Sequence, residues 1–234
     1  MLVRGFPAQA FGTNCYVVAA GPGEQCVVVD PGIGVVDQLD ELLREHRLQP
    51  VAVLLTHGHL DHTFSVTPVC GARGIPAWIH PDDREQLDDP VRFLAAGSAQ
   101  LFGGRLEWTV PDDVRLLDPA EPLEVAGLRI GVDLAPGHTP GSVVFRLPGH
   151  EESAEAVPPL LLSGDVLFAG SIGRTDLPGG SWEQMQRSLA TVVLPMADET
   201  VVLPGHGPST TIGRERAANP FLQDLPPAPP SRGL

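Results

Sequence analysis

The 234-residue chain contains no lysine: all 15 of its basic residues are arginines, and they stand against 29 acidic residues. Without a lysine amine the protein has neither Schiff-base catalysis nor a Walker-type phosphate-binding loop. The formal net charge of -14 at pH 7 also argues against nucleic acid and anionic membranes, because phosphate groups are bound by basic surfaces. We therefore expect neither nucleic acid nor a membrane as a partner.

Cysteine and long apolar runs are also scarce. The three cysteines, Cys15, Cys26 and Cys70, are odd in number and contain no C-x-x-C pair, which excludes a disulfide framework and argues against a thiolate zinc site. No run of 18 apolar residues is present to span a membrane, and residues 1–14 lack the apolar stretch of a signal peptide. The sequence predicts a soluble, cytoplasmic protein and leaves its oligomeric state open.

Short apolar runs bounded by Gly, Pro or Asp predict strands, and 42% hydrophobic residues are enough for a substantial core. The Gly21-Pro22-Gly23 sequence predicts a hairpin turn between the first two of these runs. The predicted strands are Cys15–Ala19, Cys26–Asp30, Val51–Thr56, Ala77–His80, Leu128–Leu134, Ser142–Leu147, Leu160–Ser163 and Thr200–Leu203.

Two segments have apolar residues at helical spacing. The first runs from Val36 to Leu43, and the second, from Met185 to Val193, follows a capping-box pattern that begins at Ser181. Strands with interspersed helices and no strict alternation predict an α/β (α+β) layered sandwich. We expect one domain over residues 1–222, an acidic surface loop over 148–159, and a proline-rich, disordered or extended tail over 223–234.

Four metal-binding side chains stand within six residues after the strand Val51–Thr56: His57, His59, Asp61 and His62. Residues two apart in an extended chain project to the same side, so His57 and His59 can bind one metal ion. Asp61 and His62 follow where the chain turns toward a helix and can reach a second ion. So dense a group is difficult to explain as core or surface residues.

Three further candidates, His138, Asp165 and His206, follow later predicted strands, each directly after a glycine. Glycine lets the backbone turn and approach closely, and functional groups commonly lie on loops held by a rigid sheet. Alone, His138 or His206 is more often an ordinary loop histidine. Together with the first cluster, all three become candidate ligands.

These motifs resemble the metallo-β-lactamase superfamily. The resemblance implies a four-layer αβ/βα sandwich with two divalent metal ions in a groove at one edge of the sheets. It implies one ion on His57, His59 and His138, a second ion on Asp61, His62 and His206, and Asp165 bridging the two. We count Asp61 and Asp165 as catalytic as well as metal-binding. Zinc is the expected metal, with iron or manganese as alternatives.

Asp165 stands where the commonest β-lactamases of this superfamily have a cysteine, which points away from that antibiotic-hydrolysing branch. The stretches 13–16, 30–32, 173–180 and 219–222 look like bacterial glyoxalase II-like (hydroxyacylglutathione hydrolase-like) enzymes. The resemblance implies that metal-activated hydroxide cleaves a small-molecule thioester. The chain after His206 is short compared with the helical segment that grips glutathione in larger members, so the resemblance does not imply glutathione.

Asp30 and Arg174 are candidates outside the ligand set. Asp30 ends a predicted strand and can accept a hydrogen bond from a ligating histidine, or it can be an ordinary turn aspartate. Arg174 lies in a loop shortly after Asp165 and can bind a substrate carboxylate with two hydrogen bonds, or it can pair with Asp176.

A second function fits the same residues. A mononuclear iron persulfide dioxygenase of the same superfamily would use His57, His138 and Asp165 as a facial triad with open positions for oxygen. The complete set of second-site residues favours the hydrolase, and it disfavours a non-catalytic metal-binding module. Metal content measured together with oxygen uptake separates the two enzymes.

Overall fold

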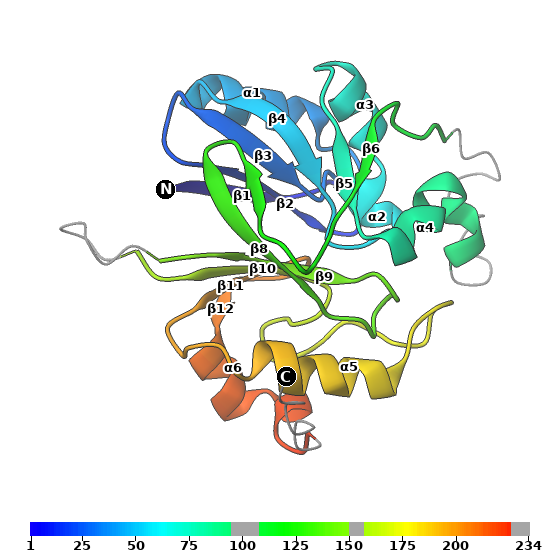
Figure 1. Ribbon diagram of the computed structural model, residues 1–234, viewed down its shortest axis with the longest axis vertical. Helices are drawn as coiled ribbons and strands as arrows, with labels where there is room; N and C mark the ends of the chain where they lie inside the picture. Colours follow the sequence, from blue (N-terminus) through cyan, green and yellow to red (C-terminus); the bar gives the residue numbers. More distant parts are fainter. Residues whose placement is uncertain (95–107, 150–156, 226–234) are drawn as a thin grey trace.

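The computed structural model describes residues 1–94, 108–149 and 157–225. Two six-stranded mixed sheets face each other (Figure 1), with the strand orders β1-β2-β3-β4-β5-β6 and β12-β11-β10-β9-β8-β7. The first sheet contains β1 (Leu2–Pro7), β2 (Asn14–Ala19), β3 (Gln25–Val29), β4 (Gln49–Leu54), β5 (Ala77–Ile79) and β6 (Val114–Leu116). The second contains β7 (Leu123–Val125), β8 (Leu128–Leu134), β9 (Val143–Leu147), β10 (Leu160–Gly164), β11 (Val201–Pro204) and β12 (Thr210–Thr211).

Helices cover the outer face of each sheet. Figure 1 shows α1 and α3 beyond the first sheet and α5 and α6 beyond the second. The helices are α1 (Val36–His46), α2 (Leu60–Thr63), α3 (Val66–Gly71), α4 (Arg84–Asp88), α5 (Trp182–Ser188) and α6 (Ile212–Ala218). Short 3₁₀ turns occupy Pro81–Asp83, Pro90–Phe93 and Pro220–Leu222, and a π turn, Leu189–Val193, continues α5.

Three apolar layers hold this four-layer sandwich together, one between the sheets and one under each pair of helices. Successive residues of a strand point to opposite faces. In β2, Val17 therefore packs toward α1 and α3, while Val18 packs between the sheets. The strands read as continuous apolar runs because both of their faces are buried.

The structure confirms the α/β sandwich, the single-domain fold and all eight predicted strands. It also confirms both predicted helices, and the Ser181 side chain accepts a hydrogen bond from the Gln184 amide at 3.3 Å. The chain turns into a helix, α2, at Asp61 and His62, as expected, whereas the predictions missed β1, β6, β7, β12 and the helices α3, α4 and α6. Most of the predicted tail, 226–234, and most of the predicted loop, 150–156, lie outside the described residues, so both stay predictions.

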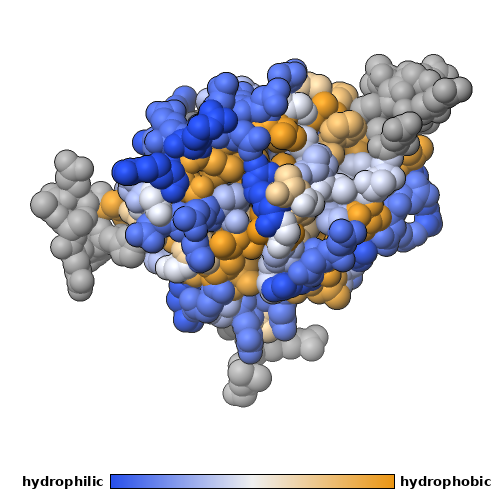
Figure 2. All heavy atoms as spheres, turned by 90° about the horizontal axis from the view of Figure 1, so that it is seen from above, coloured by the Kyte–Doolittle hydropathy of each residue, from blue (hydrophilic) through white to orange (hydrophobic). Residues whose placement is uncertain are grey.

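The described helices are all too short or too polar to cross a lipid bilayer. On the face seen from above, hydrophilic side chains alternate with several smaller apolar patches (Figure 2). The cellular compartment stays a prediction.

Gly137 ties the turn after β8 to helix α5. Its φ of +144° is unfavourable for other residues, and an added Cβ would lie 2.4 Å from the Met185 backbone. We expect Gly137→Ala to lower the free energy of unfolding by about 2–5 kcal/mol, through backbone strain and overpacking.

Urea titration of both this variant and Gly71→Ala measures the effect. An added Cβ at Gly71, the last residue of α3, meets nothing within 4 Å, so that control should be neutral or slightly stabilising. Equal stability of the two variants would contradict the packing argument.

Candidate metal centre

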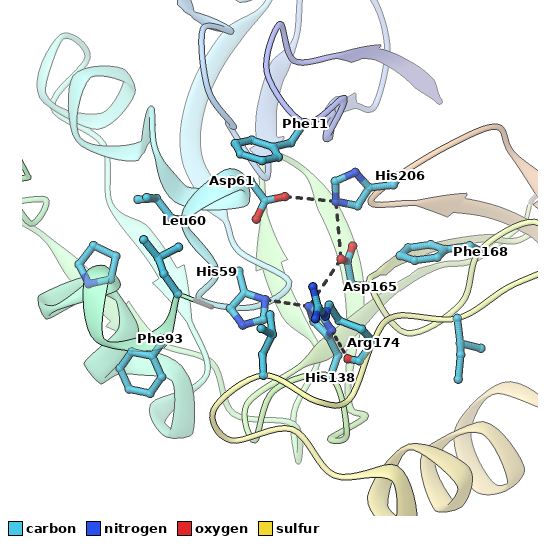
Figure 3. A pocket seen from close by; sticks show the side chains of 14 residues that line it. Phe11, His59, Leu60, Asp61, Phe93, His138, Asp165, Phe168, Arg174 and His206 are labelled. Atoms are coloured by element: carbon cyan, nitrogen blue, oxygen red, sulfur yellow. Dashed lines mark hydrogen bonds and ion pairs between the residues drawn. The ribbon is translucent and has the colours of Figure 1, made fainter. Parts of the chain in front are cut away.

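The candidate ligands lie on loops at one edge of the two sheets. His57 and His59 follow β4, and Asp61 and His62 lie in the short helix α2. The others leave the ends of three strands of the second sheet: His138 follows β8, Asp165 follows β10, and His206 follows β11. Figure 3 shows side chains from both sheets converging at this edge.

The structure brings the candidates together in two triads. His57, His59 and His138 form one, and Asp61, His62 and His206 form the other. In the first triad, His59 Nδ1 lies 2.8 Å from His138 Nε2. In the second, His206 Nε2 lies 3.2 Å from Asp61 Oδ2 and 3.3 Å from His62 Nε2. These are the two ligand sets that the family resemblance implies.

Asp165 lies between the triads. Its Oδ2 is 3.5 Å from His138 Nε2 and 3.6 Å from His206 Nε2, and its Oδ1 is 3.3 Å from His62 Nε2. One carboxylate therefore reaches a ligand of each triad, as a bridging ligand must.

A buried carboxylate, Asp30, orients the first ligand loop. Its oxygens accept hydrogen bonds from the Thr56 amide at 2.9 Å and the Thr56 hydroxyl at 2.6 Å, and His62 Nδ1 lies 2.9 Å away. The Thr56 hydroxyl in turn lies 3.1 Å from His57 Nδ1. With a proton on Nδ1 of both rings, the Nε2 lone pairs of His57 and His62 point to the centre, the arrangement in which outer partners fix a ligating imidazole.

Arg174 contributes its backbone as well as its side chain. Its carbonyl oxygen lies 2.7 Å from His138 Nδ1, which leaves Nε2 of that ring free for a metal. Its guanidinium donates to both carboxylate oxygens of Asp176, at 2.7 and 2.8 Å. The side chain is thus paired with Asp176, the simpler of the two alternatives for this residue.

Polar atoms of three candidate ligands are buried without a hydrogen bond, and this tests whether a cation fits. His57 Nε2, His59 Nε2 and Asp165 Oδ1 form no hydrogen bond within the described part of the chain. Buried polar atoms in proteins are normally paired. Imidazole nitrogens and carboxylate oxygens suit zinc, iron and manganese, so the residues present fit a divalent metal centre.

The protonation states also suit metal binding, which needs neutral imidazole and ionised carboxylate. Burial, with smaller contributions from neighbouring imidazoles, lowers the pKa of His57 well below its usual value and that of His59 to about 3. Burial raises the pKa of Asp165, but His62 and other histidines outweigh it and lower the net value. His62 and His206 are the exceptions. Burial lowers the pKa of each, but Asp165, Asp61 and Asp30 outweigh it for His62, and Asp61 and Asp165 outweigh it for His206, so both net values are raised.

Comparison with known proteins identifies the family. The model of the metallo-β-lactamase superfamily matches residues 8–206. The chain belongs to this superfamily. It is therefore a metal-dependent hydrolase by family.

Three proteins that are similar to this chain in sequence or structure carry different descriptions. Hydroxyacylglutathione hydrolase GloC of Haemophilus influenzae is 33% identical over 95% of this chain and 98% of its own. The structure titled BLEG-1 B3 metallo-β-lactamase has 37% identity and a TM-score of 0.81, over 95% of this chain and all of its own. The structure of TTHA1623 in a di-iron-bound form has 36% identity and a TM-score of 0.72, over 94% of this chain and all of its own.

Sequence reasoning missed Asp83, a buried residue that joins two ligand loops. Its fully buried carboxylate accepts hydrogen bonds from the Gly58 amide at 2.9 Å, the Thr139 hydroxyl at 2.6 Å and the Gly141 amide at 2.7 Å. Gly58 separates His57 from His59, and Thr139 follows His138. Asp83 thus fixes both loops of the first triad, although in sequence Pro81-Asp82-Asp83 resembles an ordinary turn.

The stretch 13–16 holds the second triad in the same way. The Thr13 hydroxyl donates to Asp61 Oδ2 at 2.9 Å. The Tyr16 hydroxyl donates to the Pro204 carbonyl at 2.8 Å, and the Asn14 amide group donates to the same carbonyl at 2.9 Å. These bonds position the loop that carries His206.

Asp83→Asn should weaken metal binding about 10–100-fold, the usual effect of losing an outer partner of a ligand. The amide presents an NH₂ group where the carboxylate now meets donors from Gly58, Thr139 and Gly141. Competition with a chromophoric chelator measures the affinity.

Asp82→Asn is the matched control, because the Asp82 side chain is 59% exposed and adjoins Asp83 in sequence. Circular dichroism of both metal-free variants checks folding separately. Wild-type metal affinity in a folded Asp83→Asn protein would show that Asp83 does not position the ligand loops.

Proposed function

We propose that this protein hydrolyses a thioester of a small thiol, using two divalent metal ions. Zinc is the first candidate, and iron and manganese are the alternatives. The observation that carries the proposal is Asp165, whose carboxylate lies 3.5 Å from His138 Nε2 and 3.6 Å from His206 Nε2. The 33% identity to a relative named hydroxyacylglutathione hydrolase supports a thioester as the substrate.

Seven side chains would hold the metals. His57, His59 and His138 would hold one ion and Asp61, His62 and His206 the other, with Asp165 lying between the two sets. When bound, such ions lower the pKa of a coordinated water toward neutrality and polarise a carbonyl oxygen. The protein supplies the frame: Asp30 contacts His62, Thr13 donates to Asp61, and Asp83 accepts from the Gly58 amide between His57 and His59.

The reaction needs no separate protein acid. Water adds to the acyl carbon, the C–S bond breaks, and its electron pair leaves with sulfur. One proton of the water ends on sulfur and the other is released to solvent, which gives a carboxylate and a thiol. A thiol has a pKa of about 8.5, so its thiolate leaves readily. Burial raises the pKa of Asp61, but His62 and His206 outweigh it, so the net value is lowered, as it is for Asp165. Both carboxylates are ionised at neutral pH and act as ligands rather than acids.

Metal counting combined with two assays tests the proposal. The full chain is loaded separately with zinc, ferrous iron and manganese, and its metal content is measured by mass spectrometry. Thiol release from a thioester is then followed with and without oxygen. We expect two ions per chain and thiol release that does not depend on oxygen.

The same preparations test two other activities of the superfamily. One iron per chain with oxygen uptake on a persulfide would overturn the proposal in favour of the dioxygenase. A chromogenic cephalosporin tests β-lactam hydrolysis, because a structure titled B3 metallo-β-lactamase has 37% identity to this chain. Cleavage of the cephalosporin without thioester cleavage would also overturn it.

Asp165→Asn should leave no more than one ion per chain and reduce thioester hydrolysis at least about 100-fold, more than the loss of an outer partner causes. The neutral amide would remove the negative charge that lies between the two triads. Asp198→Asn is the control, because Asp198 is exposed and pairs with Arg216 at 2.9 Å. Full metal content and turnover in Asp165→Asn would rule out a bridging role.

A further inference from the structure

The pocket over the candidate metal centre has apolar walls around its charged and titratable residues. Its volume is about 480 Å³ and fourteen residues line it, a size that suits a small-molecule ligand. Six of the fourteen are charged or titratable: five candidate ligands and Arg174. The other eight are phenylalanine, leucine, isoleucine or proline. Whatever part of the substrate extends beyond the reacting carbonyl therefore meets hydrocarbon.

Three phenylalanines from separate segments surround the centre (Figure 3): Phe11 near Asp61, Phe168 beside His206, and Phe93 across the pocket. The Phe168 ring stands edge-on to the His206 ring, with centroids 5.9 Å apart. Aromatic rings supply large apolar contact area with few rotatable bonds. The lining can thus enclose an apolar group on more than one side.

Phe11 is held in an unfavourable conformation. Its φ is +62°, and its side chain is 59% exposed. A bulky residue in the left-handed region is strained by about 1–3 kcal/mol, and exposing an aromatic ring gains no burial. Strained backbone conformations of this kind are common at ligand-binding sites, where the residue contacts the ligand.

A buried network fixes the Phe168 wall to the last helix, α6. The Glu215 carboxylate accepts hydrogen bonds from the Gly170 amide at 2.7 Å and the Thr210 hydroxyl at 2.6 Å. The Asn219 side-chain amide donates to the Glu215 carboxylate at 2.8 Å and to the Ser171 carbonyl at 3.1 Å. The loop that carries Phe168 is therefore part of the packed fold, so this apolar wall exists before substrate binds.

The described lining has few groups that could bind a charged part of a substrate. Arg174 is its single arginine, and both Nε and Nη2 donate to Asp176. A substrate carboxylate would have to compete with Asp176 for that guanidinium. The formal net charge of -14 adds a long-range repulsion for anions. Glutathione has two carboxylates and an ammonium group, and the described lining has no free counterpart for them.

We propose that the substrate is a thioester whose arm beyond the reacting group is uncharged hydrocarbon, aromatic or branched aliphatic. This inference rests on the proposed thioester hydrolysis and deepens it. The apolar arm can be the acyl group or the thiol, and the experiment below distinguishes the two.

Two matched pairs of thioesters test the inference with the metal-loaded full chain. The acyl pair is phenylacetyl- and succinyl-N-acetylcysteamine, which differ in the acyl arm. The thiol pair is the acetyl esters of benzyl mercaptan and glutathione. We expect kcat/KM to favour an apolar member at least about tenfold, the discrimination that one methylene gives in an apolar pocket. The pair that shows the preference tells which arm occupies the pocket.

A variant that adds a charge to the pocket tests whether the preference for apolar thioesters arises there. Leu177→Arg places a cation in the lining, and it should reverse or abolish the preference for the apolar member. Leu116→Arg is the matched control, because Leu116 is 54% exposed on β6 and outside the pocket lining; its preference should equal that of the wild type. An unchanged preference in Leu177→Arg would contradict the assignment to this pocket.

Binding separates failure of this inference from failure of the proposed function. Calorimetry compares two uncleavable thioethers, S-phenethyl- and S-(3-carboxypropyl)-N-acetylcysteamine. If thioesters are cleaved but the apolar member is preferred in neither pair, the apolar assignment is overturned and thioester hydrolysis stands. If no thioester is cleaved, thioester hydrolysis is overturned. In that case tighter binding of the phenethyl thioether still supports the apolar pocket, and tighter binding of the carboxypropyl thioether overturns it.

Discussion

The metal centre depends on how the protein satisfies one ring nitrogen of three candidate ligands, His57, His62 and His138. His57 and His62 are tied through Thr56 and Asp30, and His138 is tied to the Arg174 carbonyl. A buried polar atom without a partner costs free energy, and a cation bound to the other ring nitrogen would remove that cost. The loops, the short helix α2 and the strand ends bring these nitrogens together.

The two sheets make this arrangement possible. Their apolar layers place the ends of β4, β8, β10 and β11 at one edge, where the backbone can leave the core and turn. Buried carboxylates then join loops from different strands: Asp30 acts within the first ligand loop, and Asp83 connects it with the loop of His138. The site is rigid because its polar contacts lie in the same packed interior as the core.

Sequence patterns predicted what depends on local spacing. Long strands such as β8 are evident because both faces are apolar, and the spacing of His57, His59 and His62 is a local signature. Strands of two or three residues, such as β12 and β6, form because a neighbouring strand pairs with them, which leaves no local pattern. The role of Asp83 depends on Gly141, 58 residues away, and that of Arg174 on a backbone carbonyl that every residue type has.

The link between α6 and the pocket has a consequence for how short a working chain can be. Glu215 and Asn219 hold the loop of Phe168 from beyond the last candidate ligand, His206. A chain ending soon after His206 would keep every ligand and still lose the support of one pocket wall. A working chain must therefore include α6. The helix is needed for the shape of the pocket, not for binding the metal.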